Sequence, residues 1–127
     1  MGLADYQDIA VEVAAELATR IGAAEKAGVR PEAIAIDPGF GFAKHPPHSL
    51  ALLRNLPRLT ALGFPVVAGV SRKGFIGATS GEDQPARRFP GSIAAGLFAL
   101  SQGASVLRVH DVKATVQAVR VWHTLHE

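Results

Sequence analysis

The sequence predicts an α/β fold built from βα units that lie side by side in a parallel sheet. Three short apolar runs of strand type, Ala33–Ile36, Val66–Val70 and Ser105–Val109, recur about every 35–40 residues, and sequence of helical character separates them. A polar segment follows each run directly. This rhythm predicts the order helix, strand, helix, strand, helix, strand, helix.

The first helix is expected from about Asp5 to Ala27. Its apolar residues repeat at every fourth position, as on one face of an α-helix: Ile9, Val13, Leu17 and Ile21. Gly28 is a good residue to end the helix, because glycine adopts the left-handed conformation at little cost. Pro31 then helps to start the turn into the first strand.

The second helix is expected to begin near Ser49, a plausible N-cap, and to end at Gly63. Its apolar face comprises Leu50, Leu53, Leu56 and Leu59. Pro57 lies inside this pattern and should kink or divide the helix, because proline lacks the amide hydrogen that the helix needs.

The remaining segments follow from composition. The stretch Gly77–Pro90 is rich in glycine, serine and charged residues and predicts a long mobile loop. A helix of small residues is expected from Gly91 through Gln102. Asp111 is the natural N-cap of the last helix, on which one face is expected to carry Val112, Val116, Val119 and His123.

Composition excludes several classes of protein. The 127 residues carry a formal net charge of +2, and the basic residues are dispersed rather than gathered into a nucleic-acid-binding patch. The chain has no cysteine, so it has neither disulfides nor thiolate metal sites. No apolar run approaches the ~20 residues of a membrane span. Since residues 1–5 do not resemble a secretion signal, a cytoplasmic protein is expected.

The polar segments after the three strands are candidates for chemistry. They are Asp37-Pro38-Gly39-Phe40-Gly41-Phe42-Ala43-Lys44, Ser71-Arg72-Lys73 and Arg108-Val109-His110-Asp111. Side chains alternate along a strand, so Arg108 and His110 share one face, and Ser71 and Lys73 point together with Arg72 opposed. In parallel α/β folds the strand ends meet at one rim, where a carboxylate, an ammonium, a guanidinium and an imidazole would converge.

These three motifs, in this order and spacing, resemble the dihydropteroate synthase family of pterin-binding TIM barrels. The resemblance covers essentially the whole chain but only the C-terminal half of such an enzyme. It implies a partial (β/α)8 barrel that comprises the last three parallel strands with four helices, with residues 1–127 as the C-terminal part of one pterin-binding domain. Three strands cannot close a barrel, so we expect this fragment to form a homo-oligomer or to depend on a missing N-terminal half.

The resemblance implies substrate contacts for the first two motifs. Asp37 would bind the amino edge of the pterin, Phe42 would line the pocket for p-aminobenzoate, and Lys73 would donate to the pterin from between the two substrates. From the residues alone, Asp37 is as readily a turn or N-cap residue, and Lys73 a solvated loop lysine. The family often has a serine directly after this lysine, whereas this chain has Gly74, which removes one side-chain contact to the aminobenzoate carboxylate.

The third motif would hold the rest of the pterin diphosphate. The resemblance implies that Arg108 stacks on the pterin and that His110 helps to bind the diphosphate, with Val109 among the substrate-binding residues. Asp111 is most simply the helix N-cap. An isolated histidine is more often a hydrogen-bonded structural residue, but its position two residues after the arginine favours an anion ligand.

The implied reaction condenses 6-hydroxymethyl-7,8-dihydropterin diphosphate with p-aminobenzoate to give 7,8-dihydropteroate and diphosphate. No catalytic nucleophile is identified, so catalysis would come from positioning and from charge. The family uses Mg²⁺, but its protein ligand belongs to the half that is not in this chain, and no metal ligand is assigned here. The alternatives are the related pterin-binding domain of corrinoid methyltransferases and a non-catalytic half-barrel that self-associates; the isolated chain is expected to be inactive as a synthase.

Overall fold

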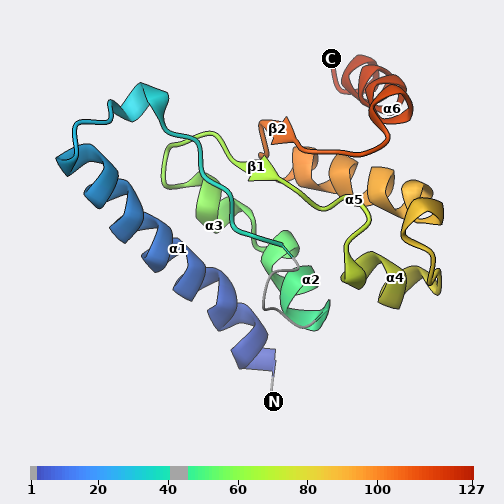
Figure 1. Cartoon of the computed structure of the whole chain (residues 1–127), viewed down its shortest axis with the longest axis horizontal. Coiled ribbons are helices and arrows are strands. Elements are labelled where there is room, and N and C mark those ends of the chain that lie inside the picture. The colour runs from blue at the N-terminus through green and yellow to red at the C-terminus, as the bar shows by residue number, and fades with distance from the viewer. Residues whose placement is uncertain (1–2, 41–45) are drawn as a thin grey trace.

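The computed structural model describes the backbone of residues 3–40 and 46–127, with side chains from residue 9 onward in these ranges (Figure 1). Phe42 and Lys44 therefore lie outside the described residues. The elements are α1 (Leu3–Lys26), a 3₁₀ turn η1 (Pro31–Ala33), α2 (Pro46–Arg54), α3 (Pro57–Thr60), β1 (Val67–Ala68), α4 (Gly74–Ser80), a second 3₁₀ turn η2 (Pro85–Arg87), α5 (Phe89–Ser101), β2 (Val106–Leu107) and α6 (Val112–Leu125).

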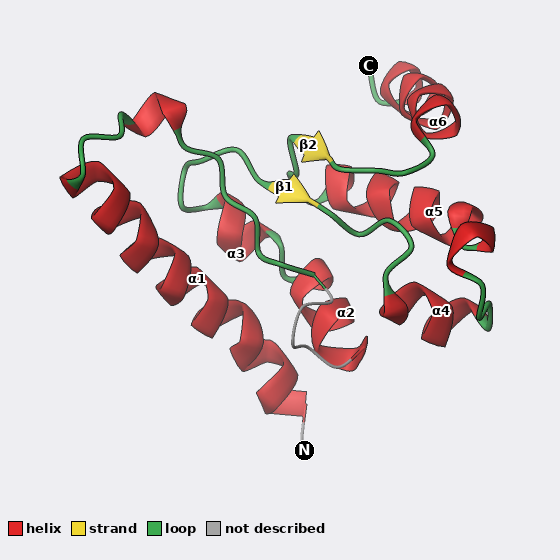
Figure 2. Ribbon diagram, in the orientation of Figure 1, coloured by secondary structure: helices red, strands yellow, loops and turns green. Residues whose placement is uncertain are grey.

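Three chain segments lie parallel at the centre of the fold (Figure 2). β1 pairs with β2 so that Val67 lies opposite Val106, and Ile36 forms a parallel bridge to Val66 on the other side of the same segment. The predicted parallel order of the three runs is therefore confirmed. The expected strands are longer than the observed ones: in the first run Ile36 forms a bridge, while Ala33 belongs to the 3₁₀ turn.

The ends of the first two predicted helices follow the local chemistry. The α1 helix ends as predicted, since Gly28 has φ of 100° and its amide and that of Val29 donate to the last carbonyls of the helix. Pro57 divides the second helix into α2 and α3, also as predicted. The N-cap assigned to Ser49 is wrong, because α2 begins at Pro46 and Ser49 is fully buried inside it.

The segment Gly77–Pro90, predicted to be one long loop, instead lies largely in helical elements. The residues from Gly74 to Ser80 form α4, and Pro85–Arg87 forms a 3₁₀ turn that leads into α5. The Arg88 guanidinium donates to the carbonyls of Glu82, Asp83 and Arg72, at 2.8, 2.9 and 3.0 Å. This one side chain thus ties the segment to the end of β1. With α4 and the divided second helix, the described residues contain six α-helices rather than the four expected.

The core lies between the helices and the three parallel segments. The buried residues shared by these layers include Phe40, Leu52, Leu56, Leu59, Val66 and Val70. The α1 helix packs on α2 and α3, while α5 packs on α4 and α6. Burial of apolar area, at about 25 cal/mol per Å², is the main favourable contribution to this arrangement.

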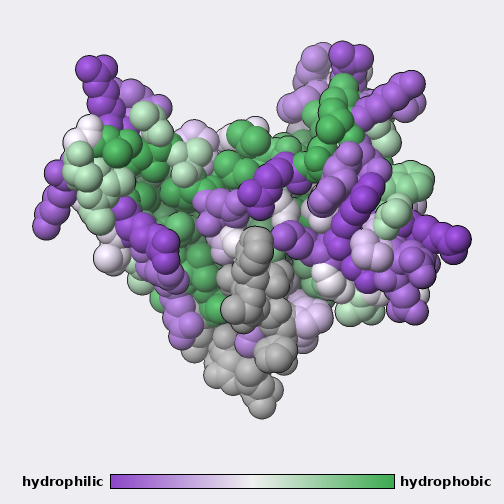
Figure 3. Space-filling model, in the orientation of Figure 1, coloured by the Kyte–Doolittle hydropathy of each residue, from purple (hydrophilic) through white to green (hydrophobic). Residues whose placement is uncertain are grey.

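Apolar side chains also remain at the surface. Figure 3 shows hydrophobic surface running along the α1 side and across the sheet toward α6. The exposed apolar residues of β2 and α6 are Val106, Val112, Val116, Val121 and Leu125, all more than 40% exposed. On α6 the only tryptophan of the chain, Trp122, stacks on His126 with ring centroids 4.0 Å apart. No helix in the described ranges is both long and apolar enough to cross a membrane.

Candidate functional site

The three motifs meet at the carboxyl ends of the parallel segments. Asp37 follows Ile36, Lys73 follows β1, and Arg108 and His110 follow β2. A cavity of about 190 Å³ at this rim is lined by Gly69, Ser71, Lys73, Arg108, Val109 and His110. The prediction that the motifs converge at one rim is therefore confirmed for the described residues.

Asp37 combines two roles that the sequence left open. One carboxylate oxygen accepts a hydrogen bond from the Gly39 amide at 2.8 Å, which is the local turn expected of an aspartate before Pro-Gly. The other oxygen lies 3.5 Å from the Arg108 guanidinium. The Asp37 side chain is 34% exposed and that of Arg108 is 60% exposed, so solvent reaches the pair and a ligand can displace it.

Gly69 forms the floor beneath Arg108. A Cβ atom at this position would meet the Arg108 guanidinium at 2.6 Å, so the arginine lies almost on the glycine backbone. The guanidinium nitrogen that lies closest to Gly69 is also the one that lies 3.5 Å from the Asp37 carboxylate. A planar cation held in this way is suited to stack on a flat heteroaromatic ring.

The alternation of side chains after β1 is confirmed. Ser71 and Lys73 both line the cavity, and Arg72 points away from it to Asp111. Lys73 occupies the N-cap position of α4 with an extended backbone, and its side chain is half-buried. After β2 the alternation holds less strictly, because Val109 contributes to the cavity wall together with Arg108 and His110.

His110 is fixed by a residue that the sequence analysis did not single out for a role. Its Nδ1 lies 2.9 Å from the Ser71 hydroxyl, and its backbone amide donates to the same oxygen at 3.3 Å. Ser71 is only 5% exposed, so this is the buried support of an exposed imidazole. The signal in the sequence was the shared direction of Ser71 and Lys73, which placed this hydroxyl at the rim.

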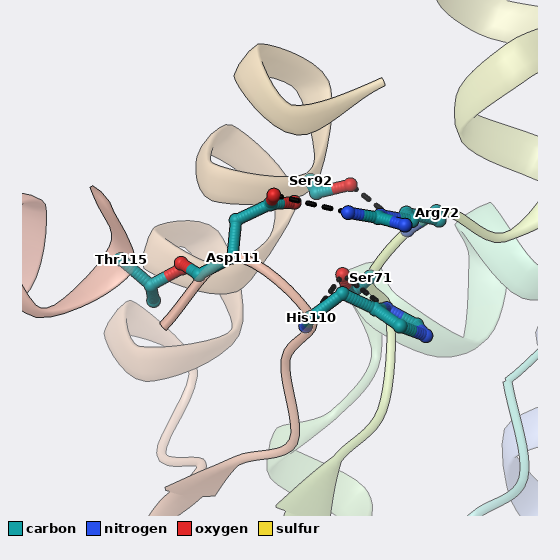
Figure 4. Close-up of polar contacts among 6 residues, drawn as sticks. All are labelled: Ser71, Arg72, Ser92, His110, Asp111 and Thr115. Carbon is teal, nitrogen blue, oxygen red and sulfur yellow. Dashed lines mark hydrogen bonds and ion pairs between the residues drawn. The ribbon is translucent and has the colours of Figure 1, made fainter. Parts of the chain in front are cut away.

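Asp111 does not cap α6 with its side chain (Figure 4). Its carboxylate lies 3.0 Å from the Arg72 guanidinium, and its backbone carbonyl accepts hydrogen bonds from the Thr115 hydroxyl and amide. Asp111 does occupy the N-cap position of α6, as predicted, but its carboxylate makes no capping hydrogen bond to the helix. An ion-pair partner outcompetes the local amides for the carboxylate.

The rim differs from the other hollows of the described surface. A larger apolar pocket of about 340 Å³ lies between α2, α4 and α5, with Leu53, Phe75 and Phe98 in its wall, and contains none of the motif residues. Among the described residues, no group of three or more histidine, aspartate or glutamate side chains is placed to hold a metal ion. The rim cavity, in contrast, is lined by Lys73, Arg108 and His110, all from the polar motifs.

Comparison with known proteins finds relatives over most of this chain. Residues 2–110 match the sequence profile of the family described as pterin binding enzyme. The dihydropteroate synthase of Neisseria meningitidis serogroup B is 49% identical over 123 residues, which is 94% of this chain and 43% of that protein. The Escherichia coli K12 enzyme of the same name is 40% identical, over 91% of this chain and 41% of its own length.

Solved structures show the same fold. The Xanthomonas albilineans dihydropteroate synthase in complex with 7,8-dihydropteroate has a TM-score of 0.92 and 50% identity, and the match covers 94% of this chain and 45% of that one. The Thermus thermophilus enzyme in complex with 4-aminobenzoate has a TM-score of 0.90 and 48% identity, over 94% and 48% of the two chains.

The match covers only part of each relative. The chain spans less than half the length of these relatives, and it corresponds to their C-terminal portion. The short parallel sheet and its helices are accordingly part of a TIM barrel, as the sequence predicted. Since the profile match covers most of its length and the rim carries the expected motifs, the chain belongs to the pterin binding enzyme family.

Proposed function

We propose that this chain supplies the C-terminal part of a dihydropteroate synthase site, which binds a pterin and the diphosphate attached to it. The observation that carries the proposal is the convergence of Lys73, Arg108 and His110 on one cavity, with Asp37 paired to Arg108 at its edge. A carboxylate, two cations and an imidazole match the donors and acceptors of such a substrate.

The proposed roles follow from the positions of the groups. Asp37 accepts hydrogen bonds from the amino edge of the pterin, in place of its present contact with Arg108. Arg108, freed from that contact, lies over the face of the ring, and Lys73 donates to the oxygen and nitrogen of the opposite edge. His110, held from behind by Ser71, faces the diphosphate.

The proposed reaction needs no protein nucleophile. The amine of p-aminobenzoate forms a bond to the pterin methylene carbon, the bond from that carbon to the diphosphate oxygen breaks, and the amine loses a proton. Diphosphate leaves with the bonding electrons, and the cations at the rim stabilise its charge. Relatives have been solved with 7,8-dihydropteroate, 4-aminobenzoate and 6HMPPP, which supports these substrates.

Further parts of the proposal concern residues and partners beyond the rim. Phe42, which lies outside the described residues, and Val109 are proposed to line the substrate pockets. Mg²⁺ is proposed to accompany the diphosphate, held by protein groups other than those assigned here, and to neutralise charge on the leaving group. We propose the cytoplasm as the location, because the substrates are small charged molecules.

The remainder of the barrel is proposed to come from another polypeptide segment or a second copy of this chain. A TIM barrel has eight strands, and the described residues supply three parallel segments. Alone, the 127-residue chain is therefore proposed to turn over little, while the rim keeps a measurable affinity for 7,8-dihydropteroate.

The test is the substitution Lys73→Ala, with Lys113→Ala on the exposed side of α6 as the matched control. Loss of a charge-assisted hydrogen bond, worth roughly 1.5–3 kcal/mol, should weaken the binding of 7,8-dihydropteroate roughly 10- to 150-fold. The melting temperature should hardly change, because Lys73 lies at a solvent-accessible rim.

Titration calorimetry of both variants and the parent, beside thermal melts, gives the answer. The proposal for Lys73 is wrong if Lys73→Ala binds 7,8-dihydropteroate as tightly as Lys113→Ala. A parent chain without measurable affinity would contradict the proposed pterin site itself.

A further inference from the structure

We propose that Arg72, through its ion pair with Asp111, is a positioning residue that sets the places of Lys73 and His110 at the rim. This inference rests on the proposed function, since it concerns the same site. It starts from a regularity in the chain. β1 and β2 pair residues that lie 39 positions apart, and beyond the strands two side-chain contacts continue at the same spacing, Ser71 with His110 and Arg72 with Asp111.

The two side-chain contacts thus extend the register of the sheet after its backbone hydrogen bonds have ended. Arg108 donates its amide to the Ala68 carbonyl, which is the last backbone hydrogen bond between the two strands in the described ranges. After it the two chains diverge into α4 and α6, and without a connection the two loops would be free to shift relative to each other. The two contacts cross this gap side by side, as Figure 4 shows.

The backbone of Arg72 supports a positioning role. Its φ of 60° makes it the one described residue other than glycine with a positive φ. The left-handed conformation is unfavourable for a residue with a β-carbon, and it persists only where the surroundings enforce it. The turn at Arg72 directly precedes Lys73, so the same conformation sets the direction in which Lys73 leaves the strand.

The surroundings hold Arg72 at three points. Its amide donates to the Ser92 hydroxyl at 2.8 Å, its carbonyl accepts from Arg88 at 3.0 Å, and its guanidinium lies 3.0 Å from the Asp111 carboxylate. The first two contacts fix the backbone and come from the start of α5 and the residue before it. The third is the one that reaches the loop carrying His110.

The charge pair is better suited to orienting the loops than to stabilising the fold. Both side chains are between a quarter and a third exposed, and only one nitrogen–oxygen contact joins them. The Arg72 Nε and the second Asp111 oxygen are buried and make no hydrogen bond within the described residues. Desolvation of such groups offsets much of the Coulomb attraction, so the net stabilisation is small while the fixed geometry remains.

The test uses Asp111→Asn and Arg72→Asn in the full 127-residue chain. Asparagine tolerates the left-handed backbone, so Arg72→Asn removes the guanidinium and leaves the turn. Glu16→Gln is the control, because it breaks a pair of similar length, 3.1 Å from Arg20, on the exposed surface of α1. The nitrogen-15 resonances of the His110 ring report its hydrogen bond to Ser71, and calorimetry reports the affinity for 7,8-dihydropteroate.

Both asparagine variants should shift the His110 ring resonances and weaken 7,8-dihydropteroate binding about 10-fold, while Glu16→Gln should change neither. A purely structural pair would instead lower the melting temperature and leave the ring resonances and the affinity as they are, which would overturn the inference. The ring resonances are measured without ligand, so they decide the role of Arg72 even if the parent chain fails to bind 7,8-dihydropteroate and the proposed function falls.

Discussion

Two glycines lie beneath two arginines, and the arginines differ in how firmly they are held. A methyl group at Gly69 would meet the Arg108 guanidinium at 2.6 Å, and one at Gly77 would meet the Arg88 guanidinium at 2.5 Å. Arg108 is 60% exposed and has one carboxylate partner among the described residues, whereas Arg88 donates to three carbonyls. The same substitution should therefore affect binding at one position and folding at the other.

Gly69→Ala should leave the free energy of unfolding within about 1 kcal/mol of the parent, because the Arg108 head can move aside into solvent. Its effect should appear in binding, with 7,8-dihydropteroate affinity reduced severalfold, because the added methyl group displaces the Arg108 guanidinium from its position over the glycine. Urea unfolding and calorimetry measure the two quantities. Unchanged affinity with lowered stability would contradict this account of Gly69.

Gly77→Ala should cost about 1–3 kcal/mol in the free energy of unfolding, because the Arg88 head cannot move without giving up its carbonyl partners. Urea unfolding of this variant beside Ala78→Gly, which alters an exposed residue of the same helix, separates crowding from helix propensity. A Gly77→Ala variant at least as stable as the parent would contradict this account, because helix propensity alone favours alanine over glycine.

Those residues of the site whose positions depend on strand ends and on side-chain alternation could be predicted from the sequence. Asp37, Lys73 and His110 come to one rim because each directly follows a parallel segment, which any parallel sheet would require. The role of Arg88 was missed because its partners are backbone carbonyls 5, 6 and 16 residues away. Every residue has such a carbonyl, so the sequence does not indicate which of them an arginine binds. The ion pair of Asp111 with Arg72 was missed for a related reason, since the two residues lie 39 positions apart.

At the scale of elements, the segment from Gly74 to Arg87 shows how tertiary contacts order a weak local sequence. Its glycine, serine and charged residues are typical of a loop, yet Phe75 and Ile76 are buried and anchor α4 to the core. The Arg88 side chain then binds the carbonyls that follow α4. Pro57 and Gly28 act within their own helices, and for that reason their effects were predictable.

Arg88→Lys should loosen the segment after α4, because an ammonium cannot donate to three separated carbonyls in the way that a guanidinium can. Trypsin should then cleave after Arg87, which is exposed, about 10-fold faster, with little change in helix content by circular dichroism. Trypsin cleaves after lysine as well as arginine, so Arg88→Lys leaves the number of possible cleavage sites unchanged and the two rates can be compared directly. Arg120→Lys, on the exposed surface of α6, serves as the control and should leave the cleavage rate unchanged.

At the scale of the whole molecule, the sheet is open within the described residues. The Ile36 segment and β2 each pair with β1 and have no other strand partner there. Strand edges of this kind favour pairing with another chain, and exposed valines on β2 and α6 add apolar area beside them. The parallel order was predictable from the βα spacing, whereas the shortness of the strands was not, because it reflects which neighbours are present.

The 127-residue chain, 13.3 kDa as a monomer, should therefore self-associate at micromolar concentration. Light scattering should give a mass of at least twice the monomer, and Val112→Lys with Val121→Lys on α6 should lower it. A single species of monomer mass across this concentration range would contradict the prediction.

A steady-state assay of the purified chain should give 7,8-dihydropteroate at a rate close to background, because the rim supplies only part of the site proposed for the two substrates. Mass spectrometry of the sample excludes a longer contaminant. Turnover comparable to that of the full-length relatives, from this chain alone, would show that the remaining barrel is not required.

The stack of Trp122 on His126 gives the chain an optical probe of its own. No other residue is a tryptophan, so fluorescence excited selectively in tryptophan reports on Trp122 of α6 alone. Its indole is half-buried beside Val121 and Leu125, at the margin of the exposed apolar surface. Any partner that covers α6 should shift the emission to shorter wavelength, whereas a ligand that fills only the rim should leave it unchanged, so a single unlabelled spectrum distinguishes assembly from substrate binding.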